Sequence, residues 1–135
     1  MAIRVLLVED TPAVRDELRS LLTGQDGIEL VGETGEGKSA LELAGALPVD
    51  VLVMDIRMPH LCSMSAVRHM LDAAPHVKIV LVSFQSDIRY VKENLRAGVS
   101  AYVLKDCVYE ELVEAVHIAA AGGHFVSPEI EIGLP

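Results

Sequence analysis

The stretch Ile3-Arg-Val-Leu-Leu-Val8 runs directly into the acidic pair Glu9-Asp10. Its six apolar-leaning residues have the length of a buried strand. A second apolar run, residues 51–54, ends just as abruptly in Asp55. In a parallel α/β sheet the carboxyl ends of the strands converge on the crevice where ligands bind. The two junctions therefore predict a parallel sheet that gathers three carboxylates at one edge.

Two later apolar runs, residues 79–82 and 101–104, end at Ser83 and Lys105. A hydroxyl and an amine would then join the carboxylates at the same edge of the sheet. Three carboxylates repel one another unless a cation joins them, and a neighbouring Lys and hydroxyl suit the oxygens of a phosphoryl group. The pattern predicts a site for Mg²⁺ (or Mn²⁺) and a phosphoryl group.

Strand-like runs alternate five times with segments of helical period. The expected strands are residues 3–8, 28–31, 49–54, 77–82 and 101–104. The expected helices begin after Thr11, at Ser39, near Ser65, after a cap at Ser86, and close to Val108. Strict β-α alternation with short loops predicts an α/β fold with a doubly wound, five-stranded parallel sheet and right-handed crossovers.

Composition sets limits on function. The 135 residues fit a single domain, and the chain carries 20 acidic against 11 basic residues, a formal net charge of −9. An acidic surface repels phosphate backbones, so we expect no binding of nucleic acid by this chain alone. About half of the residues are apolar and few are aromatic, which suits helices packed on both faces of a buried sheet.

The sequence also predicts a cytoplasmic protein without membrane contact. Cys62 and Cys107 lack the spacing of a metal or redox motif, which favours a reducing compartment. The first apolar run is too short for a signal peptide and ends in two acids. No apolar run approaches the roughly 18 residues that a membrane span needs.

Taken together, these features resemble the bacterial response-regulator receiver domain. The matching residues are Glu9-Asp10, Asp55 within Asp-Ile-Arg-Met-Pro, Ser83, Tyr102, and Lys105 within Tyr-Val-Leu-Lys-Asp. The resemblance implies a flavodoxin-like sheet with strand order 2-1-3-4-5 and a ligand crevice between the first and third strands. It divides the chain into a receiver domain, residues 1–122, and a C-terminal tail or linker, residues 123–135.

The resemblance also assigns roles at the crevice. Asp55 would accept a phosphoryl group from the phosphohistidine of a cognate sensor histidine kinase. Glu9, Asp10, Asp55 and the backbone carbonyl of Arg57 would hold the metal ion, and Lys105 would pair with phosphoryl oxygens. Such a protein is a signalling switch that catalyses its own phosphorylation and dephosphorylation, and we do not expect a metabolic enzyme.

The switch would act through Ser83 and Tyr102. The Ser83 hydroxyl would donate to the phosphoryl group and move inward, which lets Tyr102 adopt a buried rotamer and favours a phosphorylation-dependent homodimer. Arg57, Phe84 and Gln85 occupy positions where the family varies its reaction rates, and Phe84 is larger than the small residue usual there.

The loop after Asp55 also departs from the family pattern. It reads Cys62-Ser63 where an Asp-Gly pair is usual, and without glycine the backbone has fewer conformations. A zinc site formed by His60, Cys62 and His69 lacks a fourth ligand of suitable spacing and is not expected.

Two alternative functions are weighed. The segment Gly32-Glu-Thr-Gly-Glu-Gly-Lys-Ser39 matches the P-loop pattern of nucleotide hydrolases in full. That reading leaves Glu9-Asp10, Ser83 and Lys105 without a role, so the match is interpreted as coincidental. The other alternative is a phosphorylation-independent receiver that acts only as an interaction module, with Phe84 as a steric block.

The tail predicts a longer regulator. Gly122-Gly123 is followed by His124-Phe-Val-Ser-Pro-Glu-Ile130, which resembles the junction between receiver and output domains in NarL/FixJ-type regulators. We expect the natural protein to continue into a LuxR-type helix-turn-helix domain, through which alone it would bind DNA and regulate transcription. A single-domain regulator with a frayed tail is the alternative.

Overall fold

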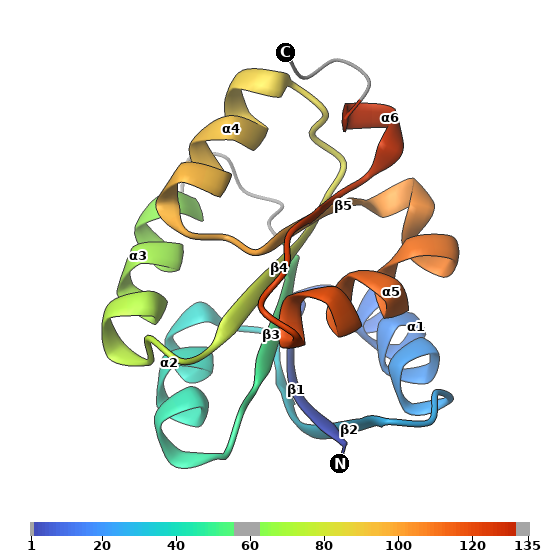
Figure 1. Ribbon diagram of the computed structural model, residues 1–135. Coiled ribbons are helices and arrows are strands. Elements are labelled where there is room, and N and C mark those ends of the chain that lie inside the picture. The colour runs from blue at the N-terminus through green and yellow to red at the C-terminus, as the bar shows by residue number, and fades with distance from the viewer. Residues whose placement is uncertain (1, 56–62, 132–135) are drawn as a thin grey trace.

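The computed structural model describes residues 2–55 and 63–131, which form helices on both faces of one central sheet (Figure 1). The strands are β1 (Ile3–Val8), β2 (Ile28–Thr34), β3 (Val51–Asp55), β4 (Lys78–Ser83), β5 (Ala101–Leu104) and β6 (Phe125–Val126). The helices are α1 (Pro12–Thr23), α2 (Gly37–Ala46), α3 (Ser63–Ala73), α4 (Ile88–Ala97), α5 (Val108–Ala120) and the short α6 (Pro128–Glu131). A 3₁₀ turn, η2 (Lys105–Cys107), joins β5 to α5.

The sheet is parallel and has the order β2-β1-β3-β4-β5-β6. The order 2-1-3-4-5 expected for the first five strands is confirmed. The count of five strands is wrong, because Phe125 and Val126 pair with Ala101 and Tyr102 as a sixth strand. Two residues are too few to show the period-2 alternation by which a strand is recognised in a sequence.

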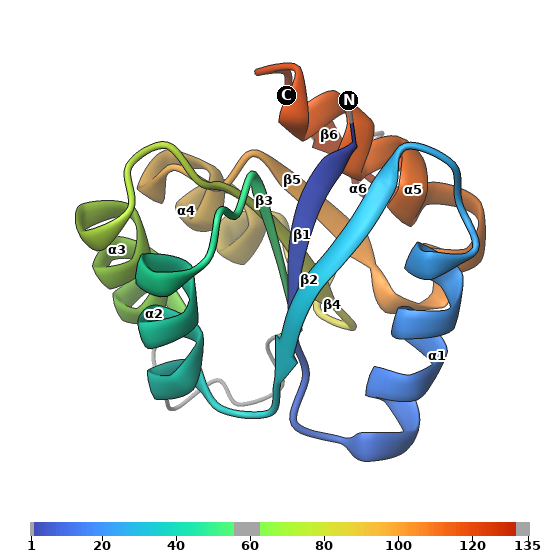
Figure 2. The same ribbon diagram turned by 90° about the horizontal axis from the view of Figure 1, so that it is seen from below.

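Alternate residues of each strand supply two separate cores. Val5 and Leu7 of β1 face the side covered by α1 and α5, whereas Leu6 and Val8 face α2, α3 and α4. Figure 2 shows this division from below, with α1 and α5 on one side of the sheet and the other three long helices opposite. Strands buried on both faces explain the nearly continuous apolar runs in the sequence.

Two helix starts differ from the expectation. The α4 helix begins at Ile88, and its cap is Asp87, whose carboxylate accepts from the Arg89 amide at 2.8 Å, instead of Ser86. The α2 helix begins at Gly37, two residues before the expected Ser39. Both shifts fall within the range expected for helix ends. Among the described residues, no helix is long and apolar enough to cross a membrane.

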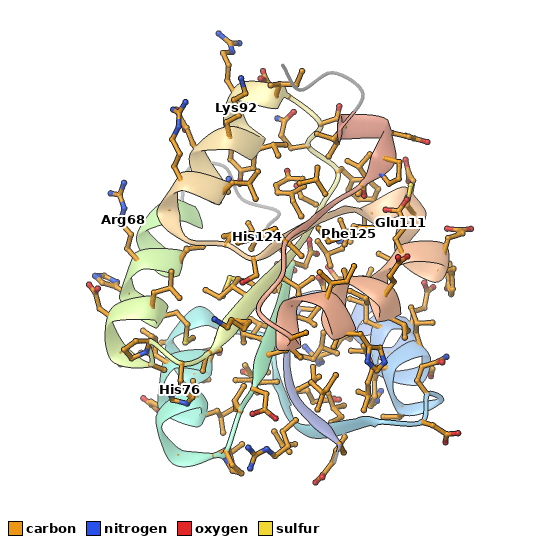
Figure 3. All side chains as sticks on the ribbon, in the orientation of Figure 1. Arg68, His76, Lys92, Glu111, His124 and Phe125 are labelled. Carbon is orange, nitrogen blue, oxygen red and sulfur yellow. The ribbon has the colours of Figure 1, made fainter. Side chains whose placement is uncertain are left out.

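Residues 124–131, here called the C-terminal segment, pack along the outer edge of β5. The Ser127 amide donates to the Tyr102 carbonyl at 3.0 Å. The Ser127 hydroxyl donates to the Glu111 carboxylate and accepts from the Leu104 amide at 2.8 Å. Ile130 is 3% exposed and lies in the core shared with α4. Figure 3 labels Glu111 of α5 and Phe125 of β6, and Phe125 packs against the core on the face covered by α1 and α5.

Candidate functional site

Three carboxylates meet where β1 and β3 end. The two strands are neighbours in register, with Val8 opposite Met54, so the residues that follow them lie side by side. Carboxylate oxygens of Glu9, Asp10 and Asp55 all lie within 4.8 Å of one another. The grouping predicted from the two strand ends is therefore present in the structure.

Lys105 supplies a positive charge from the end of β5. Its ammonium group forms an ion pair with Asp55 Oδ2 and lies 3.7 Å from Glu9 Oε2. The Lys105 side chain is only 8% exposed, so water screens these charges weakly. One ammonium group faces three carboxylates, so the cluster keeps an excess of negative charge.

Two oxygens of the cluster lack hydrogen bonds. Within the described part of the chain, the buried Glu9 Oε2 and Asp55 Oδ1 have no hydrogen-bond partner. Buried polar atoms without partners are rare and costly, and they indicate a missing ligand or ion. Clustered carboxylate oxygens are the donors that hard divalent cations such as Mg²⁺ prefer. The residues present fit such an ion.

The arrangement disfavours the charged form of the Glu9 carboxyl. The side chain is fully buried, and burial, reinforced by the neighbouring Asp55, raises its pKa to about 8. The backbone amide of Thr11, 3.1 Å from Glu9 Oε1, and the Lys105 charge offset only part of this increase. A cation would remove the repulsion and restore the carboxylate form.

The hydroxyl expected at the site lies at the end of β4. Ser83 is buried and pairs in register with Leu104, the residue before Lys105. Its hydroxyl oxygen accepts from the Gln85 amide at 3.0 Å. The structure thus brings Ser83 to the sheet edge that also holds the carboxylates and Lys105.

Tyr102 of β5 is completely buried against α4, so the buried rotamer that was expected on phosphorylation is already present in this structure. Its hydroxyl donates to the Gln85 carbonyl at 2.6 Å, and its ring contacts the Tyr90 ring edge to face, with centroids 6.3 Å apart. Burial raises the Tyr102 pKa to about 12, so the phenol stays protonated. The backbone of Gln85 therefore contacts both Ser83 and Tyr102, a link that the sequence did not predict.

Phe84 projects from the same loop and is 67% exposed. Its ring centroid lies 5.1 Å from the Lys105 ammonium, within the range of a cation–π contact. The ring therefore contacts a side chain of the site, Lys105.

Other residues named from the sequence cannot be placed or lie elsewhere. Arg57, His60 and Cys62 fall outside the described residues. His69 lies on the exposed side of α3. Among the described residues, the group of metal-ligating side chains that converge is the acidic one, Glu9 with Asp10 and Asp55.

The P-loop match does not form a phosphate cradle. Gly32, Glu33 and Thr34 are strand residues that pair with Leu6, Leu7 and Val8 of β1. A cradle needs a loop whose amides wrap around the phosphates, and the first three of the eight matched residues belong to β2. Lys38 is exposed at the start of α2.

Sequence reasoning missed Arg15, which lies on the first turn of α1. Its guanidinium donates to the Glu9 carbonyl at 2.7 Å. The only signal in the sequence was a basic residue five positions after the acidic pair, and such residues are usually solvated. A contact to a backbone carbonyl leaves no pattern of residue types.

Comparison with known proteins points to one family. The family model described as "Response regulator receiver domain" matches residues 5–117. The transcriptional regulatory protein YxjL of Bacillus subtilis is 38% identical over 89% of this chain and 55% of its own length. The response regulator GacA of Pseudomonas viridiflava is 34% identical over 95% of this chain and 60% of its own length.

Solved structures show the same fold. A LuxR-family two-component response regulator from Aurantimonas sp. SI85-9A1 superposes with a TM-score of 0.90 and 29% identity, covering 98% of this chain and 94% of that chain. The response regulator domain of Thermotoga maritima CheB gives a TM-score of 0.80 and 28% identity, covering 90% and 98%. This chain spans somewhat over half the length of the curated relatives it matches. It belongs to the response-regulator receiver domain family.

Proposed function

We propose that this receiver domain accepts a phosphoryl group on Asp55 in the presence of Mg²⁺ (or Mn²⁺). The observation that carries the proposal is Asp55 Oδ1, a buried carboxylate oxygen without a hydrogen-bond partner among the described residues. It lies beside the Lys105 ammonium and within one cluster with Glu9 and Asp10. A nucleophile needs an available lone pair, and this oxygen has one.

The chain's own residues divide the work at the site. Asp55 provides the attacking oxygen, and Lys105 pairs with the phosphoryl oxygens as a compact positive charge. Glu9, Asp10 and Asp55 would hold the metal ion, and the family resemblance adds the backbone carbonyl of Arg57, which lies outside the described residues. When bound, the ion neutralises charge that would otherwise repel the phosphoryl group from three carboxylates.

The phosphorylated state is read through Ser83 and Tyr102. Ser83 donates to a phosphoryl oxygen, and because Gln85 contacts both Ser83 and Tyr102, a movement of Ser83 reaches the tyrosine through one backbone segment. Phosphorylation thereby biases a two-state equilibrium at the face formed by α4, β5 and α5. Phe84, Gln85 and Arg57 set the rates by restricting or positioning water at the site.

The partners follow from the family. The phosphodonor is the phosphohistidine of a sensor histidine kinase, and the protein acts in the cytoplasm as a switch instead of a metabolic enzyme. A phosphorylation-dependent homodimer is the expected output. Because curated relatives are named transcriptional regulators, we propose a transcriptional output through a DNA-binding domain that is not part of this chain.

Mass spectrometry of the intact protein tests the proposal. Incubation with acetyl phosphate and Mg²⁺ should add one phosphoryl mass to the wild type. EDTA and Asp55→Ala should each abolish the addition, because they remove the metal ion and the nucleophile. Full labelling of Asp55→Ala would show that the assignment is wrong, and labelling in EDTA would show that the metal is unnecessary.

A further inference from the structure

Hydrogen bonds to two neighbouring elements, β2 and α1, hold the backbone of the acidic pair Glu9-Asp10. The Glu9 amide donates to the Thr34 carbonyl of β2 at 2.9 Å. The Glu9 carbonyl accepts from the Arg15 guanidinium of α1 at 2.7 Å. The peptide plane between Glu9 and Asp10 is therefore fixed by a charged side chain, and that plane sets the direction in which the Asp10 side chain leaves the backbone.

Arg15 is itself anchored. Its Nε lies 3.8 Å from the Glu33 carboxylate, which also pairs with Arg19 at 3.4 Å. The Arg15 side chain is 23% exposed, so its hydrogen bond to the carbonyl is partly shielded from water. Bonds with a charged donor are stronger than neutral ones, which suits this contact to a positioning role.

Gly35 leaves the space that this arrangement needs. A Cβ atom at position 35 would lie 2.9 Å from an Arg15 guanidinium nitrogen, closer than real Cβ contacts. The same atom would meet the Asp10 Cα and the Glu9 carbonyl only at an ordinary 3.5 Å. Any side chain at position 35 would thus displace the guanidinium before it disturbed the acidic pair.

We propose that Arg15 is a positioning residue for the metal site, which holds the Glu9–Asp10 peptide so that Asp10 converges with Glu9 and Asp55. The inference rests on the proposed metal-dependent function. Arg15 would not itself be a metal ligand, because its guanidinium offers only donors. It acts through the Glu9 carbonyl.

The direction in which cation affinity changes when Arg15 is replaced distinguishes a positioning role from a simple electrostatic effect. Removing a positive charge near a cation site should tighten cation binding through space. Losing the support of a metal ligand should weaken binding, typically by about tenfold or more. Arg19 provides the matched control, because it carries the same charge and shares Glu33 but has no bond to Glu9 among the contacts described.

The test is a Mn²⁺ titration of the metal-free protein, followed by the electron paramagnetic resonance signal of free Mn²⁺. Arg15→Gln should raise the dissociation constant about tenfold, Arg15→Lys should recover part of the loss, and Arg19→Gln should leave it unchanged or lower it. Thermal unfolding of each metal-free variant checks that the fold is intact. Equal Mn²⁺ affinity in Arg15→Gln and wild type would overturn the inference, whereas a wild type that binds no Mn²⁺ would overturn the proposed function itself.

Gly35→Ala gives a second, independent arm. The added methyl group should displace the guanidinium and weaken Mn²⁺ binding in the wild-type background. It should add little in the Arg15→Gln background, because the two changes remove the same contact. Additive effects would contradict the inference. If Arg15→Gln does not fold, Gly35→Ala in the wild-type background decides alone, because unchanged Mn²⁺ affinity in that variant would overturn the inference.

Discussion

Two buried polar regions lie on either side of the sheet's centre, and their hydrogen bonding differs. At the ends of β1 and β3, Glu9 Oε2 and Asp55 Oδ1 have no hydrogen-bond partner among the described residues. At the edge of β5, the Ser127 hydroxyl both donates to Glu111 and accepts from Leu104. Buried oxygens without hydrogen-bond partners are typical of a ligand-binding site, whereas buried groups with all their hydrogen bonds formed are typical of the structural framework.

This difference in hydrogen bonding predicts that mutations in the two regions change the stability of the fold in opposite directions. Removing a carboxylate from the acidic cluster should relieve repulsion in the metal-free protein. Removing the Ser127 hydroxyl should leave a buried amide without a partner and destabilise the fold. We therefore expect mutations in the acidic cluster to impair function without lowering stability, and mutation of Ser127 to lower stability without impairing metal binding.

The largest expected effect is the pH dependence of stability in the metal-free protein. A carboxyl whose pKa is raised to about 8 binds its proton more tightly in the folded chain than in the unfolded one. The stability that Glu9 contributes is therefore fully present below about pH 4.5 and is lost progressively as the pH rises towards 8. The loss attributable to Glu9 is on the order of a few kcal/mol, since one pKa unit corresponds to about 1.4 kcal/mol.

Denaturant unfolding between pH 5 and 9 measures this effect. Glu9→Gln should flatten the slope and exceed the wild type in stability at the alkaline end, because an amide has no proton to lose. Saturating Mg²⁺ should flatten the wild-type slope as well. A wild-type slope that neither Glu9→Gln nor Mg²⁺ changes would show that the acidic cluster is not its source.

Ser127→Ala should have the next largest effect. The substitution leaves the Leu104 amide buried without its acceptor, which costs about 1–3 kcal/mol of unfolding free energy. Mg²⁺ affinity should remain unchanged, because the hydrogen bonds of Ser127 go to Leu104, Glu111 and the Tyr102 backbone and not to the acidic cluster. Urea unfolding and a Mn²⁺ titration on the same sample test both halves, and a loss of metal affinity would break the proposed separation.

Lys38→Ala should have the smallest effect. Lys38 is exposed at the start of α2, and the segment before it is strand instead of a phosphate-binding loop. Phosphorylation by acetyl phosphate and thermal stability should both match the wild type. ATP binding that disappears in Lys38→Ala would instead restore the nucleotide-binding alternative.

The acidic site could be predicted because its side chains stand at the ends of apolar strand sequences. Apolar runs locate β1 and β3, and parallel topology brings Glu9, Asp10 and Asp55 together without further information. The order of the first five strands followed from the family resemblance. Ser83 and Lys105 were found by the same logic at β4 and β5.

The remaining features depend on contacts that the residue types do not predict. The two-residue strand β6 is defined by backbone pairing with β5. The Arg15 and Gln85 contacts use carbonyl and amide groups that every residue possesses. Tertiary packing selects these bonds, so the sequence pattern could not reveal them.

The identity of the phosphorylated residue tests the central claim most directly. Protein treated with acetyl phosphate and Mg²⁺ can be reduced with borohydride, which converts an aspartyl phosphate to homoserine, and then mapped by peptide mass spectrometry. The available oxygen of Asp55 beside Lys105 predicts homoserine at position 55 alone. Homoserine at position 10, or a phosphoryl group on any other side chain, would contradict the account.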